Sequence, residues 1–486
     1  MKLIKNYIYN LLFQASTLLL PLITVPYVSR VLGSNGVGIA EYTTAISMYF
    51  VIFAQFGIYF YGTRTIAYYR DDVEKRNSIF WDLTYMKFIF MTVSIALFLI
   101  MVLFFDKRYF AILLILVINI LSVGFEISWF FNGMEDMQKV AVRNIASRTI
   151  GTALIFILVK TPNDVWIYVM IFSLTGLISN IILWKFLKEH QISYKPFSFS
   201  GVKKHAIASS GLFLSSMIAI IYSCMDKTVL GSLVPASEVG HYSMASKLLG
   251  MSIGFVSCLG TVMLPRIANV FAQGDIEQVK YYTATTFNFM LMFSIYIAAG
   301  FLGASAEFVP WFLGSDFLPA INLLYILSFT VILIVMTNVF GTQLLIPMGR
   351  EKDYVISQIV GIVFLLIFSL TLVPKYHAVG TCISMVISSF IIVLYRYCLL
   401  KDILPHKAMF SEVWKYVAGG ITVVFALRYI GSTMGIGAFT TCAQIAAASI
   451  IYLAILFVFK ASILNVIYDK LVKKMLAKVK VKAVND

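Results

Sequence analysis

Residues 88–105, FIFMTVSIALFLIMVLFF, form an apolar run that contains no charged side chain. A helix needs about 20 such residues to cross the hydrocarbon core of a bilayer, which is about 30 Å thick. Backbone amides in lipid must be paired within the protein, so only helices and closed barrels are stable there. A barrel strand would show about ten residues of alternating polarity instead. This stretch therefore predicts a membrane-spanning helix.

Similar runs recur along the whole chain. Of its 486 residues, 60% are hydrophobic and 13% are charged, and the mean hydropathy is +0.89. This composition excludes a soluble globular protein. We expect an all-α integral membrane protein with about fourteen transmembrane helices. The expected spans are 8–28, 38–61, 80–105, 110–131, 140–160, 164–187, 206–226, 238–262, 283–305, 318–342, 354–373, 378–400, 411–430 and 437–459.

The positions of the charged residues between the spans indicate the orientation. Lys and Arg gather in alternate connections and in the C-terminal tail, and connections rich in these residues stay on the cytoplasmic side. An even number of spans places both termini on that side. The formal charge of +15 fits a protein that faces anionic lipid headgroups, so we expect membrane lipids, and no nucleic acid, as partners.

The chain also contains a weak internal repeat. Val37-Gly38 recurs as Val239-Gly240, and Arg64 recurs as Arg266, both at an offset of 202 residues. Two matches at one offset favour a duplicated six-span unit over chance similarity between apolar segments. Transporters built this way bind substrate between two bundles. The expected parts are an N-terminal six-helix bundle (1–187), a cytoplasmic linker (188–205), a C-terminal six-helix bundle (206–400), helices 13 and 14 (401–459) and a basic cytoplasmic tail (460–486).

Basic residues inside the expected spans are the first candidates for substrate contacts. A Lys or Arg that faces lipid at the helix centre costs about 2.5–3.5 kcal/mol, so it usually faces a bundle interior or a water-filled cavity. Lys87, Arg148 and Lys247 lie deepest, and Lys247 is the least able to extend to water. Arg30 and Arg64 would place positive charge at both mouths of a central cavity. As isolated residues, arginines at such positions are more often interfacial anchors than substrate contacts.

The role of Arg143 is left open by the sequence. This residue follows Lys139 by about one helical turn, so it either extends to the cytoplasmic interface or lines a cavity. Arg148 lies five positions further along, about 140° around the helix. We therefore expect the two arginines to occupy different faces.

Acidic residues within the spans are few. Each is expected to form an ion pair with a nearby base, with the adjacent Asp226 and Lys227 as one such pair. Glu41 and Asp226 are the first candidates for a site that couples transport to an ion. The acids within the spans are Glu41, Asp82, Glu126 and Asp226.

The motifs of common enzymes and pumps do not occur in the sequence. It contains no G-x-x-x-x-G-K-[ST] nucleotide loop, no H-E-x-x-H and no G-x-S-x-G. Its five cysteines are scattered without a C-x-x-C spacing, so neither disulfides nor a zinc site is expected. We expect a transporter without a cofactor and without enzyme activity. The alternatives are a cation-coupled multidrug or small-solute antiporter, and a membrane-embedded polysaccharide polymerase or ligase with acid and base groups on its outer face.

Three segments carry a family resemblance: TVPYVSRVLGSNGVGIAEY at 24–42, FGIYFYGTRTIA at 56–67, and DKTVLGSLVPASEVGHYSMASKLLG at 226–250. They resemble the polysaccharide-transporter branch (Wzx-type flippases) of the multidrug/oligosaccharidyl-lipid/polysaccharide (MOP) exporter superfamily. The resemblance implies two pseudo-symmetric six-helix bundles plus two C-terminal helices, a fold shared with MATE transporters.

The same resemblance implies a function. Such a flippase moves undecaprenyl-diphosphate-linked oligosaccharide repeat units from the inner to the outer leaflet of the bacterial cytoplasmic membrane, for O-antigen, capsule or exopolysaccharide assembly. Its partners would be the lipid-linked substrate, membrane lipids and other polysaccharide-assembly proteins. A diphosphate needs a positive, hydrated path, whereas cationic drugs favour an acidic one. The sign of the charge in the cavity therefore distinguishes the flippase from the antiporter.

Overall fold

The computed structural model describes residues 2–467, and all regular structure in this part of the chain is helical. Eleven helical segments of the described chain are long and apolar enough to cross a membrane. The sequence predicts fourteen spans. Two of the eleven segments each hold two expected spans, and a further expected span, 238–262, lies outside the eleven. Leu12–Tyr68 has 57 residues and Glu351–Leu400 has 50, or about 85 and 75 Å at 1.5 Å per residue. Residues 468–486 of the predicted basic tail lie outside the described part.

Both long helices change direction at a single residue. In α1 (Lys2–Gln55), Gly33 has φ 66° and ψ 179°, a conformation that glycine adopts at little cost. In α12 (Glu351–Leu400), His377 has φ 50° and ψ −130°. The two halves of each helix match two expected spans. A further helix, α9 (Ala236–Ala272), covers the expected span 238–262, so every predicted span has a helix, and the all-α membrane fold is confirmed.

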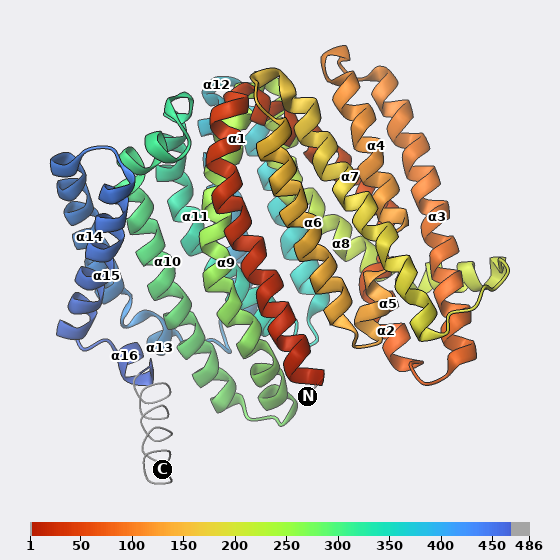
Figure 1. Cartoon of the computed structure of the whole chain (residues 1–486). Coiled ribbons are helices and arrows are strands. Elements are labelled where there is room, and N and C mark those ends of the chain that lie inside the picture. Colours follow the sequence, from red (N-terminus) through yellow and green to blue (C-terminus); the bar gives the residue numbers. More distant parts are fainter. Residues whose placement is uncertain (1, 468–486) are drawn as a thin grey trace, which may run out of the picture. The chain divides into compact units, whose positions relative to one another are not determined.

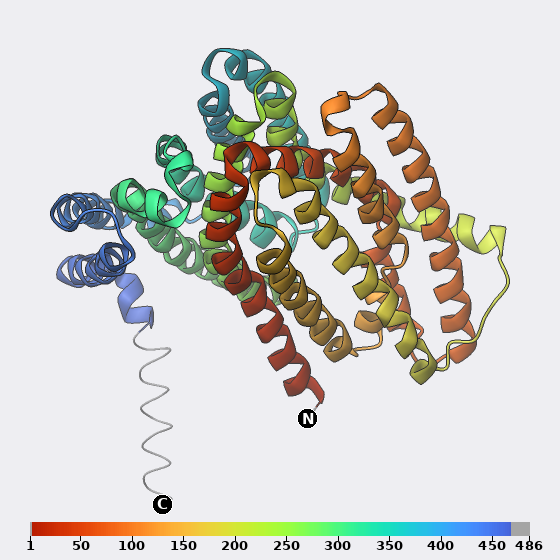
Figure 2. The ribbon, with the colours of Figure 1, turned by 45° about the horizontal axis from the view of Figure 1, so that its top comes forward.

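The helices form two compact units, Met1–Ser243 and Met244–Asp486. In the first unit α1, coloured red in Figure 1, packs most extensively against four other helices. The shorter helices α2 (Ile58–Tyr68) and α5 (Ser128–Gly133) pack against each other, and α7 (Val165–Leu183) packs against α6. Figures 1 and 2 show α6 and α7 side by side. The four helices that pack most extensively on α1 are α3 (Val73–Phe104), α4 (Phe110–Gly124), α6 (Met137–Leu158) and α8 (Phe199–Leu233).

The helix α8 groups with the first unit, although its residues fall mostly within the predicted C-terminal bundle. It packs against α1 and α3. The Oγ atom of Ser198 accepts a hydrogen bond from the backbone N–H of Gly201 at 3.2 Å, a cap that starts the helix. The last residues of the predicted linker (188–205) are therefore helical. The predicted division of the chain at this linker stays a prediction.

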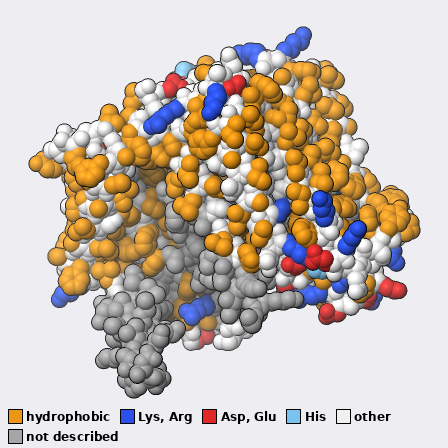
Figure 3. All heavy atoms as spheres, viewed as in Figure 1, with side chains coloured by type: hydrophobic (Ala, Val, Ile, Leu, Met, Phe, Trp, Pro, Cys, Tyr) orange, Lys and Arg blue, Asp and Glu red, His pale blue; other side chains and the backbone are white. Residues whose placement is uncertain are grey.

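The outer surface of the helices is apolar, as a lipid environment requires. Leu103 and Phe104 on α3 are 74% and 87% exposed, which would be costly in water but not in hydrocarbon. Figure 3 shows that hydrophobic side chains dominate the visible face of the helices, while charged side chains lie mostly toward its ends. Charged groups gathered at helix ends are typical of a membrane protein.

An aromatic cluster fixes α5 against α2 and α3. Phe80 on α3 stacks near Trp129 with 5.7 Å between ring centroids and lies edge-on to Phe130 at 5.2 Å. Gly62 on α2 allows this approach, because a Cβ atom there would lie 2.6 Å from the Trp129 ring. Large buried aromatic rings dominate the energy of such a contact. The cluster holds the start of α5, and with it Ser128, in place.

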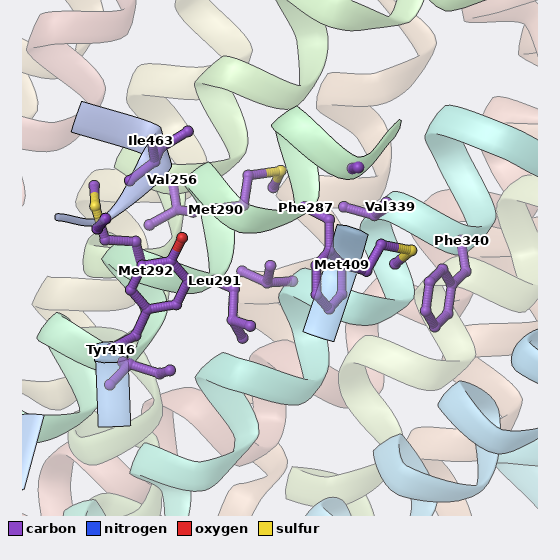
Figure 4. Packing of buried hydrophobic residues seen from close by; sticks show 14 of the residues in the cluster. Val256, Phe287, Met290, Leu291, Met292, Val339, Phe340, Met409, Tyr416 and Ile463 are labelled. Carbon is purple, nitrogen blue, oxygen red and sulfur yellow. The ribbon is translucent and has the colours of Figure 1, made fainter. Parts of the chain in front are cut away.

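The second unit is built around α10 (Ile276–Phe312), which packs against α11 (Ala320–Phe340), α14 (Val413–Met434) and α15 (Ala438–Val458). Figure 4 shows its hydrophobic core. Buried tyrosines form polar contacts within it: Tyr416 donates to Asn288 Oδ1 at 3.2 Å, and Tyr452 donates to the backbone oxygen of Met292 at 2.9 Å. The labelled core residues are Val256, Phe287, Met290, Leu291, Met292, Val339, Phe340, Met409, Tyr416 and Ile463.

Candidate functional site: an arginine-lined cavity

A polar cavity of about 350 Å³ lies within the first unit. Its walls come from the end of α1, from α2, from the start of α5, and from α6 and α7. We call it the arginine cavity, because Arg143 and Arg148 on α6 both line it. The other lining residues are Gln55, Tyr59, Glu126, Ser128, Asn144, Ser147, Gly176, Ser179 and Asn180.

Arg143 is held in place by neighbours on two other elements. Its Nη2 donates to Ser128 Oγ at 2.9 Å, and its Nη1 donates to Asn180 Oδ1. Asn180 in turn donates to the backbone oxygen and to Oγ of Ser122, both at 2.9 Å. The buried Nε of Arg143 has no hydrogen-bond partner among the described residues. The guanidinium is therefore fixed at the wall with two of its five N–H donors engaged in these bonds.

Arg148 lies against an aromatic ring rather than an acid. Its guanidinium carbon is 5.4 Å from the centroid of the Phe13 ring on α1, which is a cation–π contact. Within the described residues, neither Arg148 nor Arg143 forms an ion pair with an acidic side chain. The two arginines start from positions about 140° apart on α6, as expected, and their long side chains nevertheless reach the same cavity.

The one acid that lines the arginine cavity is already paired. Glu126 Oε2 accepts from Lys87 Nζ at 2.8 Å, and Oε1 accepts from the backbone N–H of Ser128 at 2.7 Å. Lys87 also donates to the backbone carbonyl of Glu126. The Lys87 side chain is only 1% exposed, so it lies behind the wall and neutralises this acid. The cavity thus retains the positive charge of its two arginines.

A second cavity adjoins the first. It has a volume of about 270 Å³. Tyr59, Ser128 and Asn144 line both cavities, so the polar space continues toward the first half of α1. Asn132, which lines the second cavity, donates to Tyr59 Oη at 3.1 Å. The remaining lining residues are Phe13, Met137, Val140 and Ala141.

The two candidates for ion coupling lie in another part of the first unit. Glu41 on α1 forms an ion pair with Lys227 on α8 at 2.7 Å. Asp226 is 4% exposed, and it accepts from Tyr242 Oη at 2.6 Å and from the backbone N–H of Lys227 at 2.7 Å. These contacts are consistent with a structural role for both acids. Ion coupling at Glu41 or Asp226 stays a prediction. No group of three or more His, Cys, Asp or Glu side chains in the described chain could hold a metal ion.

The other predicted substrate contacts are not lining residues of the arginine cavity. Arg30 on α1 and Arg64 on α2 are exposed, while Lys247 on α9 is half-buried and belongs to the second unit. Their roles stay predictions. Asn144 and Asn180 are cavity residues that reasoning from the sequence missed. The sequence feature that could have identified them is an amide side chain within an otherwise apolar span.

Comparison with known proteins identifies the family. Residues 3–271, more than half of the chain, match the family described as polysaccharide biosynthesis protein. This chain belongs to that family. A relative named "Putative O-antigen transporter" from Escherichia coli (strain K12) is 26% identical over 388 residues, which cover 78% of this chain and 92% of the relative. The predicted membership in the polysaccharide-transporter branch is thus confirmed.

Solved structures share the fold. The lipid II flippase MurJ in an inward closed conformation matches with a TM-score of 0.71 and 16% identity, over 95% of this chain and 100% of MurJ. An outward-facing multidrug resistance MATE transporter of the MOP superfamily matches with a TM-score of 0.57 and 13% identity, over 88% and 96% of the two chains. At these identities the likeness concerns the fold alone, and it confirms a MOP-type architecture.

Proposed function

We propose that this protein is a flippase that moves lipid-linked oligosaccharide repeat units from the inner to the outer leaflet by alternating access. The observation that carries the proposal is the arginine cavity, in which two arginines without acidic partners line a polar space between membrane-spanning helices. The family of the chain supports a substrate of polysaccharide assembly. The relative named as an O-antigen transporter supports transport of that substrate rather than its synthesis.

The chemistry of the cavity suits a phosphate-linked headgroup. Arginine is always protonated and presents a planar set of donors that matches phosphate oxygens. A hydrogen bond to a charged group contributes about 1.5–3 kcal/mol. The amides of Asn144 and Asn180 add groups that can bind sugar hydroxyls. An undecaprenyl-diphosphate-linked oligosaccharide has both features.

The charge of the cavity argues against the main alternative. A MATE-type antiporter has the same fold, so the fold does not separate the two functions. A cationic drug would need an unpaired acid at the wall, whereas the acid that is present, Glu126, is bound to Lys87. An anionic substrate is therefore favoured. The relatives named as putative O-antigen transporters favour transport over the polymerase or ligase alternative.

The membrane and the orientation belong to the same proposal. The distribution of Lys and Arg between the spans supports cytoplasmic termini. The proposed substrate is made on the cytoplasmic side and used outside, so we place the protein in the bacterial cytoplasmic membrane. Other polysaccharide-assembly proteins would receive the flipped product.

The test is a leaflet assay in a strain that lacks this chain. Lipid-linked repeat units are labelled, and their accessibility to a glycosidase added outside spheroplasts is measured. We expect inner-leaflet accumulation in the deletion strain, rescue by the wild-type chain, and no rescue by a well-expressed Arg143→Ala, Arg148→Ala double variant. Normal outward exposure without the chain would overturn the proposal. Normal exposure with altered polymer linkage would favour the polymerase, and loss of drug efflux alone would favour the antiporter.

A further inference from the structure

An apolar groove runs between α6 and α7 on the outside of the first unit. It has a volume of about 520 Å³, and we call it the α6–α7 groove. Four of its apolar side chains are open to the surroundings: Val142, Ile150, Ile178 and Ile182 are 48%, 56%, 54% and 40% exposed. Figures 1 and 2 show the two helices that form it. In a membrane, this groove faces the lipid chains.

The groove is long enough for a lipid tail. Its lining on α6 extends from Gln138 to Leu154, which corresponds to about 24 Å along the helix axis. The hydrocarbon core is about 30 Å thick. A chain lying in the groove would therefore run along the helices for most of that thickness.

The groove shares a wall with the arginine cavity. Arg143, Ser147 and Ser179 line both spaces. Ser147 Oγ donates to the backbone oxygen of Thr175 at 3.1 Å, so this wall is made largely of small polar side chains beside one arginine. One layer of side chains separates an apolar surface outside from a cationic, polar space inside.

We propose that the α6–α7 groove holds the polyprenyl tail of the substrate while the diphosphate binds Arg143 from the arginine cavity. The inference rests on the proposed function and adds to it a binding site for the polyprenyl tail. An amphipathic ligand fits two adjoining spaces of opposite polarity better than either space alone. Arg143 is the residue that can contact the junction between tail and headgroup, because it lines both spaces.

Charge decides against an ordinary anionic phospholipid as the occupant. The basic residue near the end of the groove, Lys139, is paired with Asp136 at 3.0 Å and also with Glu189. A phospholipid headgroup at this end would meet a cation that two acids already neutralise. The cation without an acidic partner is Arg143, within the wall of the cavity. A ligand whose anionic group binds Arg143 from the cavity and whose tail lies in the groove uses this cation and the apolar surface together.

The experiment measures binding to the purified full chain in phosphatidylcholine nanodiscs. Undecaprenyl diphosphate is the long-tailed probe, and inorganic diphosphate is the tail-free probe. Ile150→Trp and Ile178→Trp fill the groove. Ile157→Trp and Ile181→Trp are matched controls, because these two residues lie on the same helices, are 64% and 44% exposed, and do not line the groove.

We expect the groove variants to weaken binding of the long-tailed probe by at least about tenfold and to leave inorganic diphosphate binding unchanged. Arg143→Ala should weaken binding of both probes. Equal binding of undecaprenyl diphosphate by groove and control variants would overturn the tail site. Displacement of the probe by phosphatidylglycerol at equal concentration would assign the groove to phospholipid instead. If neither probe binds the wild-type chain, the proposed function itself fails, which is a different result from loss of the tail site alone.

Discussion

Gly38 on α1 and Gly240 on α9 lie at a reciprocal crossing of two helices. A Cβ atom on Gly38 would lie 1.7 Å from the carbonyl oxygen of Ala236, and one on Gly240 would lie 1.9 Å from the carbonyl oxygen of Ser34. Ser34 precedes Gly38 by the same interval as Ala236 precedes Gly240. Adding the 202-residue offset of the repeat turns Ser34 into Ala236 and Gly38 into Gly240. The two contacts are therefore equivalent under the repeat. Glycine allows such direct contact between helix backbones.

Substitution at this crossing should be costly. Gly38→Ala or Gly240→Ala places a methyl group against a backbone oxygen that cannot move without shifting a helix, so we expect a loss of about 1–3 kcal/mol of stability. Thermal unfolding of the purified variants measures this loss. The control is Gly211→Ala on α8, where a Cβ atom would meet no atom within 4 Å. If all three variants unfold at one temperature, the backbones are not in contact at this crossing.

The buried pair between Lys87 and Glu126 gives a second prediction. Lys87→Met leaves Glu126 without its cation, and breaking a buried ion pair in this way costs about 3–5 kcal/mol. The double variant Lys87→Met, Glu126→Gln should recover most of the folded protein, as measured by size-exclusion chromatography of detergent extracts. A well-folded Lys87→Met protein that no longer transports substrate would instead support the original prediction of a substrate contact.

Arg148 should act on substrate rather than on folding. Its contact with Phe13 is a modest one, whereas a charge-assisted bond to phosphate is worth about 1.5–3 kcal/mol. We expect Arg148→Ala to weaken inorganic diphosphate binding by about ten- to a hundredfold with unchanged thermal unfolding, and Arg148→Lys to retain part of the affinity. Wild-type affinity in Arg148→Ala would remove this residue from the site.

Lys247 is the remaining deep basic residue, and it belongs to the second unit. If it contacts the diphosphate, Lys247→Ala should lower flipping by about ten- to a hundredfold in the leaflet assay, while Lys247→Arg keeps part of it. If it forms a structural pair instead, the amount of folded protein should fall. Normal flipping by a well-expressed Lys247→Ala variant would end the claim that it handles substrate.

The sequence by itself determined the fold class and the family. The energy of an apolar run in lipid depends on its length and composition, so the position of each span could be read locally. Lys87 and Arg148 stood out for the same reason, because a charge within such a run requires an explanation wherever the helix packs. The repeat was visible because its two matches share one offset.

Only the tertiary structure shows which groups these charged side chains contact. Lys87 neutralises Glu126, which lies far away in the sequence, while Arg143, whose role was open, lines a cavity together with Arg148. The groove beside that cavity has no signature in the sequence, since its side chains are ordinary for a lipid-facing helix. The physical reason is that hydropathy acts along one helix, whereas ion pairs and cavities depend on the rotation and packing of several helices, which local composition leaves undetermined.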